Sequence, residues 1–163
     1  QMCIRDREKL DQLKLAFDTK GTVTAATSSP LTDGAAATII CEENYAKENN
    51  LNILGRIVST AVEGCDPDYM GLGPIGASKK ALMRANLSID KIDIFELNEA
   101  FASQSLACIK DLGIDQKKVN IDGGALALGH PLGATGARIT GKAADLLRRE
   151  NKKSALSTPR PIH

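Results

Sequence analysis

One histidine lies inside a glycine-rich stretch, and this combination is the clearest sign of a catalytic site in the sequence. Residues 123–138 hold five glycines, almost no large side chain and His130, the only internal histidine. Apolar residues at helical spacing follow at once: Ile139, Ala143, Leu146 and Leu147. The N–H groups and partial positive charge at a helix start favour a neutral imidazole, which can act as a general base. A tight turn that carries a histidine is the alternative interpretation.

A second stretch of small side chains covers residues 21–37 and includes Ser29. Its Thr/Val-rich start predicts a short strand, its middle a loop, and the apolar run 38–41 that follows predicts a buried strand. Such a run is typical of close packing or of a flexible connector. Its hydroxyls and backbone amides would equally suit a ligand whose own chain carries amides.

A third glycine-rich stretch, residues 70–77, opens a helix predicted over 77–85. It matches neither a dinucleotide-binding nor a P-loop fingerprint, because the glycine spacing differs and no G-K-[ST] follows. On the residues alone, Met70 is best interpreted as a core side chain. Three cations lie outside the apolar side of this helix and favour a solvated face over a phosphate-binding one: Lys79, Lys80 and Arg84.

A strand predicted over 93–97 leads into a helix that starts at Asn98 and ends before Gly113. Asn98 suits the N-cap, Glu99 the positive helix start and Gly113 the residue after the helix. Further helices are predicted over 8–17 and 42–50, and further strands over 53–59, 119–121 and 154–158. Strands and helices joined by glycine-rich turns predict an α/β fold.

These stretches resemble, in order, sequence motifs of the thiolase family. Residues 123–138 match Gly-Gly-x-x-Ala-x-Gly-His-Pro-x-Gly-x-Ser/Thr-Gly-Ala-Arg, and residues 95–102 match the Asn-Glu-Ala-Phe box. Residues 22–37 resemble Thr-x-Thr-Ala-x-x-Ser-Ser-x-x-x-Asp-Gly-Ala-Ala-Ala, and residues 70–74 resemble Met-Gly-x-Gly-Pro. The resemblance implies the thiolase fold, of which we expect the end of the first half and most of the C-terminal half, with the closing strands missing.

The resemblance also implies roles for four residues. His130 would be the base that forms a nucleophilic thiolate, and it would later donate to the thioester oxygen. Asn98 would hold a water that completes the oxyanion hole. Ser29 would lie along the pantetheine arm of coenzyme A, and Met70 would border the acyl pocket. Coenzyme A is then a substrate, and neither a bound cofactor nor a metal is expected.

Within the family, residues 62–67 and 70–74 look most like the bacterial 3-ketoacyl-CoA thiolases. The implied reaction is thiolytic cleavage of 3-ketoacyl-CoA to acetyl-CoA and a shortened acyl-CoA in fatty-acid β-oxidation. The alternatives are an acetoacetyl-CoA thiolase (acetyl-CoA acetyltransferase) and a non-catalytic chain that binds coenzyme A or a partner. A homodimer, and for the parent enzyme a multifunctional hydratase/dehydrogenase subunit, are the implied partners.

The sequence departs from the thiolase pattern at its cysteines. The family uses a nucleophilic cysteine and a second, acid/base cysteine, but no cysteine here stands in the nucleophile's context. Arg160 stands about where the second cysteine is expected. The four cysteines are Cys3, Cys41, Cys65 and Cys108. We therefore interpret the chain as a fragment and expect no thiolysis by it alone.

Four segments are predicted along the chain. Residues 1–7 are interpreted as a foreign or junction segment, and residues 8–49 as the end of the loop region and N-terminal half. Residues 50–158 correspond to the thiolase C-terminal domain, and residues 159–163 to a tail outside the family pattern.

Composition narrows the class of protein. The formal net charge of +1 gives no sign of a nucleic-acid or membrane-surface partner, and 3% aromatic residues with no Trp provide no base-stacking surface. The scattered cysteines form no C-x-x-C pair and no Cys/His cluster. They favour free thiols in a reducing cytoplasm over disulfides or a zinc site.

Overall fold

The computed structural model describes residues 7–158, so the predictions for residues 1–6 and for the tail 159–163, including Arg160, lie outside the described residues. In chain order the elements, with η for a 3-10 helix, are α1 (Arg7–Asp11), η1 (Ala25–Thr27), α2 (Glu43–Glu48), η2 (Pro67–Leu72), α3 (Gly73–Ala85), η3 (Ile89–Lys91), β1 (Ile94–Leu97), α4 (Ala102–Leu112), η4 (Gln116–Lys118), α5 (Ala125–Leu128), α6 (Leu132–Arg149) and β2 (Ala155–Thr158).

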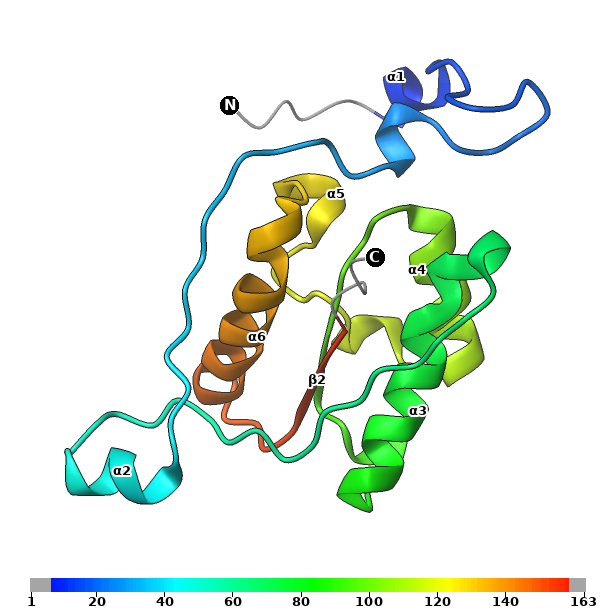
Figure 1. The fold of residues 1–163 in the computed structure, drawn as a ribbon. Helices are drawn as coiled ribbons and strands as arrows, with labels where there is room; N and C mark the ends of the chain where they lie inside the picture. Colours follow the sequence, from blue (N-terminus) through cyan, green and yellow to red (C-terminus); the bar gives the residue numbers. More distant parts are fainter. Residues whose placement is uncertain (1–6, 159–163) are drawn as a thin grey trace.

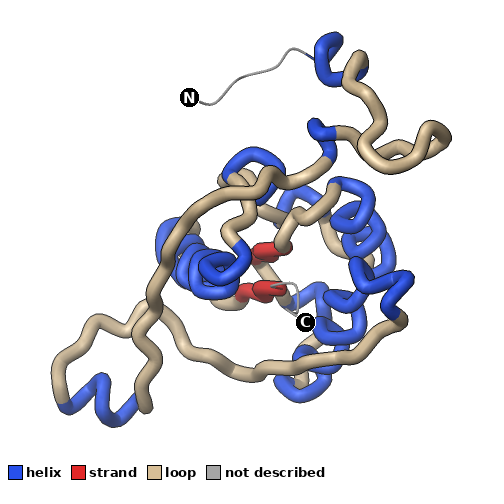
Figure 2. Tube along the Cα trace, turned by 45° about the horizontal axis from the view of Figure 1, so that its top comes forward, coloured by secondary structure: helices blue, strands red, loops and turns tan. Residues whose placement is uncertain are grey.

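Two parallel strands form the centre of the described fold. Ile94 of β1 lies opposite Ala155 of β2, and Leu97 lies opposite Thr158. Helix α6 packs on both strands, while α3 packs on β2 and on α4. The strands therefore lie between α6 on one face and α3 with α4 on the other (Figures 1 and 2). This layering confirms the predicted α/β class and explains why all of β1 is buried.

Apolar side chains fill the space on both faces of the strands. On the α3 side, Leu82, Ile92 and Phe95 form a buried cluster. On the other side, Ile139 and Leu146 of α6 are almost fully buried. Their separation of two helical turns places them on one face of α6. The apolar spacing after residue 138 thus corresponds to the face of α6 that covers the sheet.

Two predicted strands are wrong. Residues 38–41 and 53–59 form no strand and run as irregular segments outside the layers (Figure 1). Ile39 is 93% exposed and Val58 is 61% exposed. A strand needs a neighbour that offers its own backbone N–H and C=O groups. Within residues 7–158, β1 and β2 pair with each other and neither pairs with these segments.

The N-terminal elements are shorter than predicted. The helix predicted over 8–17 ends at Asp11. The strand predicted from Thr22 is reduced to one antiparallel bridge between Leu15 and Thr24. Isolated short helices and two-stranded ribbons are marginal in water without a packed face, and this part of the chain has few buried residues.

Three other boundaries follow local signals. The helix predicted over 42–50 is present as α2, and the helix predicted over 77–85 begins earlier, at Gly73, with proline in its first turn. The strand predicted over 119–121 is a single parallel bridge to β1. It ends there because Asn120 has a φ of 46°, which no strand residue adopts.

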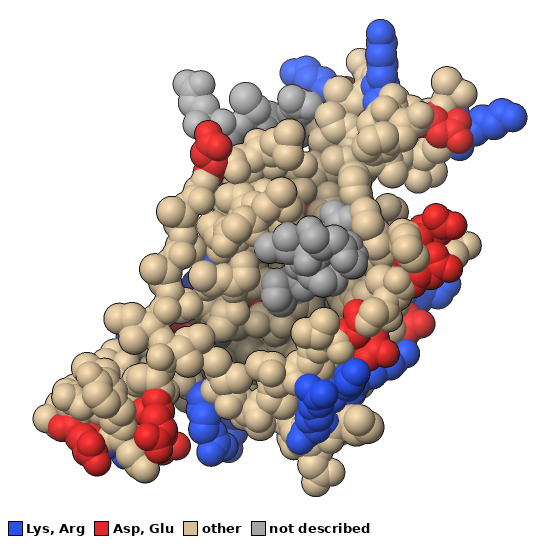
Figure 3. Space-filling model, viewed as in Figure 1, with Lys and Arg blue, Asp and Glu red and all other residues tan. Residues whose placement is uncertain are grey.

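The cations of α3 have partners within the described chain. Lys79 pairs with Asp111 of α4, Lys80 pairs with Glu63, and Arg84 donates to the carbonyl of Thr60. Figure 3 shows positive and negative side chains close together along this edge. These pairs fit the predicted solvated face. No helix in the described part of the chain is long and apolar enough to cross a membrane.

Candidate active site

His130 lies in the short connection between α5 and α6. Helix α6 begins at Leu132, which confirms the prediction of a helix close behind the histidine. Gly129, directly before it, has a φ of 93°, and a Cβ there would overlap the side chain of Thr32. Glycine is therefore required at this position, because L side chains rarely adopt that backbone conformation.

The hydrogen bonds of Thr135 assign the tautomer of His130. The Thr135 hydroxyl oxygen lies 2.8 Å from Nδ1 of His130 and 3.0 Å from the carbonyl oxygen of Pro131. The hydroxyl hydrogen is donated to that carbonyl, so the hydroxyl oxygen accepts from the ring. This assignment, made from the hydrogen-bond network, puts the proton on Nδ1 and the lone pair on Nε2.

Asn98 faces this lone pair. Its Nδ2 lies 3.4 Å from Nε2 of His130, which is the geometry of a long N–H···N hydrogen bond. Asn98 follows β1 directly and is 3% exposed, and its Oδ1 is buried without a hydrogen-bond partner in the described residues. The predicted N-cap role is wrong, because the N-cap of α4 is Phe101. The Asn98 side chain points to the histidine instead of capping the helix.

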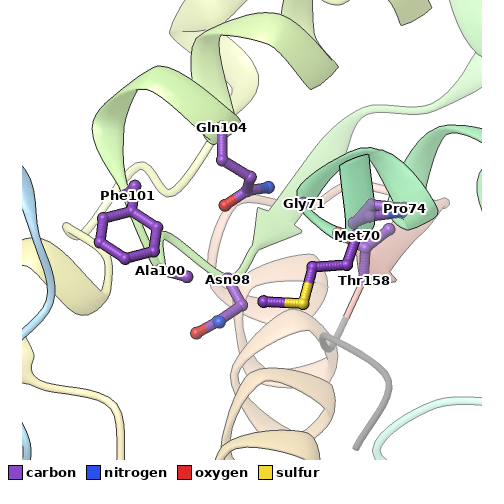
Figure 4. Close-up of a pocket in the computed structure, with 8 residues that line it drawn as sticks. All are labelled: Met70, Gly71, Pro74, Asn98, Ala100, Phe101, Gln104 and Thr158. Atoms are coloured by element: carbon purple, nitrogen blue, oxygen red, sulfur yellow. The ribbon is translucent and has the colours of Figure 1, made fainter. Parts of the chain in front are cut away.

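A small, mostly apolar cavity of about 90 Å³ lies beside Asn98. Figure 4 shows Met70 of η2 and Asn98 on its wall, with Phe101 at one side. The full lining is Met70, Gly71, Pro74, Asn98, Ala100, Phe101, Gln104 and Thr158. Ligand pockets usually measure at least about 300 Å³, so this cavity suits only a small group such as a short acyl segment. The structure thus brings Met70 and Asn98 together.

Ser29 lies next to the turn that carries Asn98. Its backbone N–H and its hydroxyl both donate to the carbonyl of Ala100, at 3.0 and 3.2 Å. The following residues reach the histidine, because the His130 backbone N–H donates to Pro30 O at 3.3 Å and to Thr32 Oγ1 at 2.8 Å. Segment 29–32 therefore connects the Asn98 turn to the His130 loop.

Sequence reasoning missed the residues that support this pair. Thr135 stands five positions after His130, at the first turn of the following helix, and this spacing could have indicated it. Thr32 carries no local signal that points to His130. Glu99 was expected at the start of α4, but its carboxylate accepts from Leu126 N in α5. Asn120 was assigned to a strand.

The described cysteines differ in their surroundings. Cys41 and Cys65 are exposed. Cys108 is fully buried, and its thiol lies near Gly71 O and the side-chain amide of Gln104. Burial raises the pKa of the Cys108 thiol, so little thiolate forms at neutral pH. Across residues 7–158, no three His, Cys, Asp or Glu side chains converge as metal ligands.

Sequence comparison identifies the class of protein to which this fold and this pair of residues belong. The chain belongs to the thiolase family: residues 51–159 match the thiolase C-terminal domain, and residues 4–44 match the thiolase N-terminal domain. It is 54% identical over 155 residues to proteins named 3-ketoacyl-CoA thiolase from Aliivibrio salmonicida and Cronobacter sakazakii. Each match covers 93% of this chain and 40% of the relative, so the chain spans about two-fifths of their length.

Solved structures agree with this assignment. Bacillus anthracis acetyl-CoA acetyltransferase is 45% identical with a TM-score of 0.90, over 92% of this chain and 38% of that one. Human mitochondrial 3-ketoacyl-CoA thiolase, solved in complex with CoA, is 47% identical with a TM-score of 0.90 over the same shares. The expected thiolase fold is confirmed.

Proposed function

We propose that these residues supply the histidine and asparagine of a 3-ketoacyl-CoA thiolase active site. The reaction is the cleavage of 3-ketoacyl-CoA by coenzyme A to acetyl-CoA and an acyl-CoA shortened by two carbons. The observation that carries the proposal is the pair itself: an imidazole whose Nε2 carries the lone pair, 3.4 Å from a buried amide.

In the proposed reaction, Nε2 of His130 takes the proton of a cysteine thiol contributed from outside this stretch of chain. The thiolate attacks the 3-keto carbon, and the bond between carbons 2 and 3 breaks. The electron pair of that bond passes to acetyl-CoA, which a second cysteine protonates. Coenzyme A then gives its thiol proton to that cysteine, and its thiolate takes the acyl group from the enzyme. The first cysteine leaves as a thiolate and recovers its proton from Nε2 of His130.

Asn98 is suited to stabilise the negative charge on the thioester oxygen. Its buried Oδ1 has no partner in the described residues and can accept one hydrogen of a water molecule. The other hydrogen of that water, together with the protonated Nε2 of His130, would point to the thioester oxygen. A donor of this kind contributes about 10²-fold or more in rate.

Ser29 and Met70 are proposed to contact the substrate. The hydroxyl oxygen of Ser29, which donates to Ala100, keeps a lone pair for an amide N–H of the pantetheine arm. Met70 borders the small cavity and would contact the acyl chain. We further propose that the parent enzyme is a cytoplasmic homodimer that works with a hydratase/dehydrogenase subunit in fatty-acid β-oxidation.

A hybrid enzyme tests the proposal. Residues 8–158 of this chain replace the matching part of the Aliivibrio salmonicida relative, and thiolysis is followed as loss of a 3-ketoacyl-CoA. We expect activity in the hybrid and a loss of at least about 10²-fold in His130→Ala. An inactive hybrid that is folded and binds coenzyme A would contradict the proposal and favour a non-catalytic coenzyme A-binding chain.

An acetoacetyl-CoA thiolase is the second candidate, because the Bacillus anthracis neighbour is an acetyl-CoA acetyltransferase of equal TM-score. The same hybrid separates the two when a medium-chain 3-ketoacyl-CoA is compared with acetoacetyl-CoA. We expect the medium-chain substrate to be cleaved with the higher kcat/KM. The reverse order would favour the second candidate.

A further inference from the structure

Behind the Asn98–His130 pair lies a second polar pair, Glu99 and Asn120. Neither side chain lines the cavity beside Asn98. Their side chains hydrogen-bond to each other at 2.5 Å. Asn120 also binds the backbone of β1 directly before Asn98, and Glu99 binds the backbone of α5, which leads into the loop of His130.

Asn120 holds the end of β1. Its Oδ1 accepts from the N–H of Leu97 at 2.9 Å, and its Nδ2 donates to the carbonyl of the same residue at 2.9 Å. The amide therefore pairs with both backbone groups of one residue, as a neighbouring strand would. Leu97 directly precedes Asn98, so this pairing fixes the backbone from which the Asn98 amide projects. The left-handed φ of 46° aims the Asn120 side chain back at the strand.

Glu99 connects that strand end to the loop of His130. One carboxylate oxygen accepts from Asn120 Nδ2, and the other accepts from Leu126 N in α5 at 3.1 Å. Leu126 lies four residues before His130. The carboxylate packs against Gly124, where any Cβ would overlap it. Both carboxylate oxygens of Glu99 are therefore engaged, one by the residue that holds β1 and one by the backbone of α5.

The Asn98–His130 hydrogen bond needs such a link because it is long and would be lost after a small displacement of either residue. At 3.4 Å it is near the upper limit for a hydrogen bond, so a shift of a few tenths of an ångström between β1 and α5 would break it. We propose that Glu99 and Asn120 are positioning residues: they hold the strand end that bears Asn98 and the loop that bears His130 at the separation that catalysis requires. This inference rests on the proposed function.

The test uses two variants of the hybrid enzyme. Glu99→Gln keeps the acceptor for Asn120 but presents an amide to Leu126 N. Asn120→Gly keeps the left-handed backbone and removes both side-chain bonds to Leu97. The control for Asn120→Gly is Asn151→Gly, because Asn151 also has a positive φ but follows the C-terminal end of α6. The control for Glu99→Gln is Glu48→Gln, because Glu48 is exposed. We expect kcat to fall about 10-fold or more in both variants, with KM within about twofold and little change in the controls.

A second readout does not depend on activity. In the 163-residue chain with His163→Gln, His130 is the only histidine, and its ring nitrogens are observed by ¹⁵N NMR. We expect Glu99→Gln and Asn120→Gly to move the Nε2 resonance and weaken the cross-peak between the Asn98 amide protons and the ring. Unchanged resonances and unchanged kcat in folded variants would overturn the inference, as would an equal loss in Asn151→Gly. An inactive hybrid with altered resonances would contradict the proposed function and leave the positioning role supported.

Discussion

The Thr135 hydroxyl lies 2.8 Å from Nδ1 of His130 and gives its own hydrogen to the carbonyl of Pro131. Its orientation is fixed by the start of α6, so one helical turn determines which ring nitrogen carries the proton. The nitrogen left to act as a base, Nε2, is the one that faces Asn98. This relationship is the basis of the predictions about catalysis.

Replacing Thr135 should change the tautomer of His130. Thr135→Val keeps the buried shape but removes the acceptor for the Nδ1 proton, so the Nε2–H form becomes populated. We expect ¹⁵N NMR of the chain with His163→Gln to show a mixture of tautomers, and the hybrid enzyme to lose about 10-fold in kcat. Thr135→Ser is the control, because it keeps the hydroxyl. An unchanged tautomer in the valine variant would show that Thr135 does not set it.

Asn98 should matter for the rate and little for binding. In the hybrid, Asn98→Ala removes both the contact with His130 and the acceptor for the proposed water. We expect kcat to fall by about 10²-fold with KM nearly constant, since the oxyanion forms only during reaction. Asn44→Ala in the exposed helix α2 serves as the control. A loss confined to KM would assign Asn98 to substrate binding.

The described cysteines should differ in reactivity. Iodoacetamide should modify the exposed Cys41 and Cys65 rapidly, while Cys108 should react only when the chain unfolds, because it is buried and its pKa is raised. Peptide mapping by mass spectrometry, with and without urea, measures each site. Rapid labelling of Cys108 in the folded chain would contradict the burial of its thiol against Gly71.

Glu96 should make the stability depend on pH. It lies in β1 at 2% exposure, and burial raises its pKa to about 7 from an ordinary 4.5, against the attraction of Arg138 and Lys142 and with repulsion from Asp122 and Glu99. Below about pH 4.5 both the folded and the unfolded chain are protonated at this group. Between 4.5 and 7 the unfolded chain releases the proton first, so the free energy of unfolding falls with rising pH and levels off above 7.

Urea unfolding of the chain between pH 4.5 and 8 tests this sign. Relative to Glu96→Gln, the unchanged chain should lose roughly 1–3 kcal/mol of stability across that range, which allows for partial solvent screening. For the control Glu48→Gln, at an exposed position, the free energy of unfolding should vary with pH as it does in the unchanged chain. If the free energy of unfolding of Glu96→Gln also varied with pH in parallel with that of the unchanged chain, Glu96 would not be the buried group that keeps its proton.

Local sequence patterns predicted the long helix and both strands of the sheet. Helix α6 carries apolar residues at helical spacing, and Gly113 ends α4 with a φ of 65°. The strands β1 and β2 were found because short apolar runs lie between clear turns. Residues 38–41 and 53–59 are also apolar runs, but they have no pairing strand among the described residues, and an apolar run cannot show whether a partner is present.

The residues proposed for the site came from sequence motifs, while the residues that support them did not. The glycine-rich loop and the family motifs indicated His130, Asn98, Ser29 and Met70, and the structure places Asn98 against His130 and Met70 beside Asn98. The supporting hydrogen bonds of Glu99 and Asn120 join segments more than 20 residues apart. Such contacts depend on how the elements pack, which no local pattern encodes.

Whether His130 activates a thiol can be measured directly. In the hybrid enzyme, the rate of iodoacetamide modification at the nucleophilic cysteine is followed by mass spectrometry at pH 7, with His130 intact and with His130→Ala. We predict modification about 10²-fold slower in the alanine variant, because the thiol has lost its base. Equal rates in the two proteins would contradict the claim that Nε2 of His130 is the catalytic base.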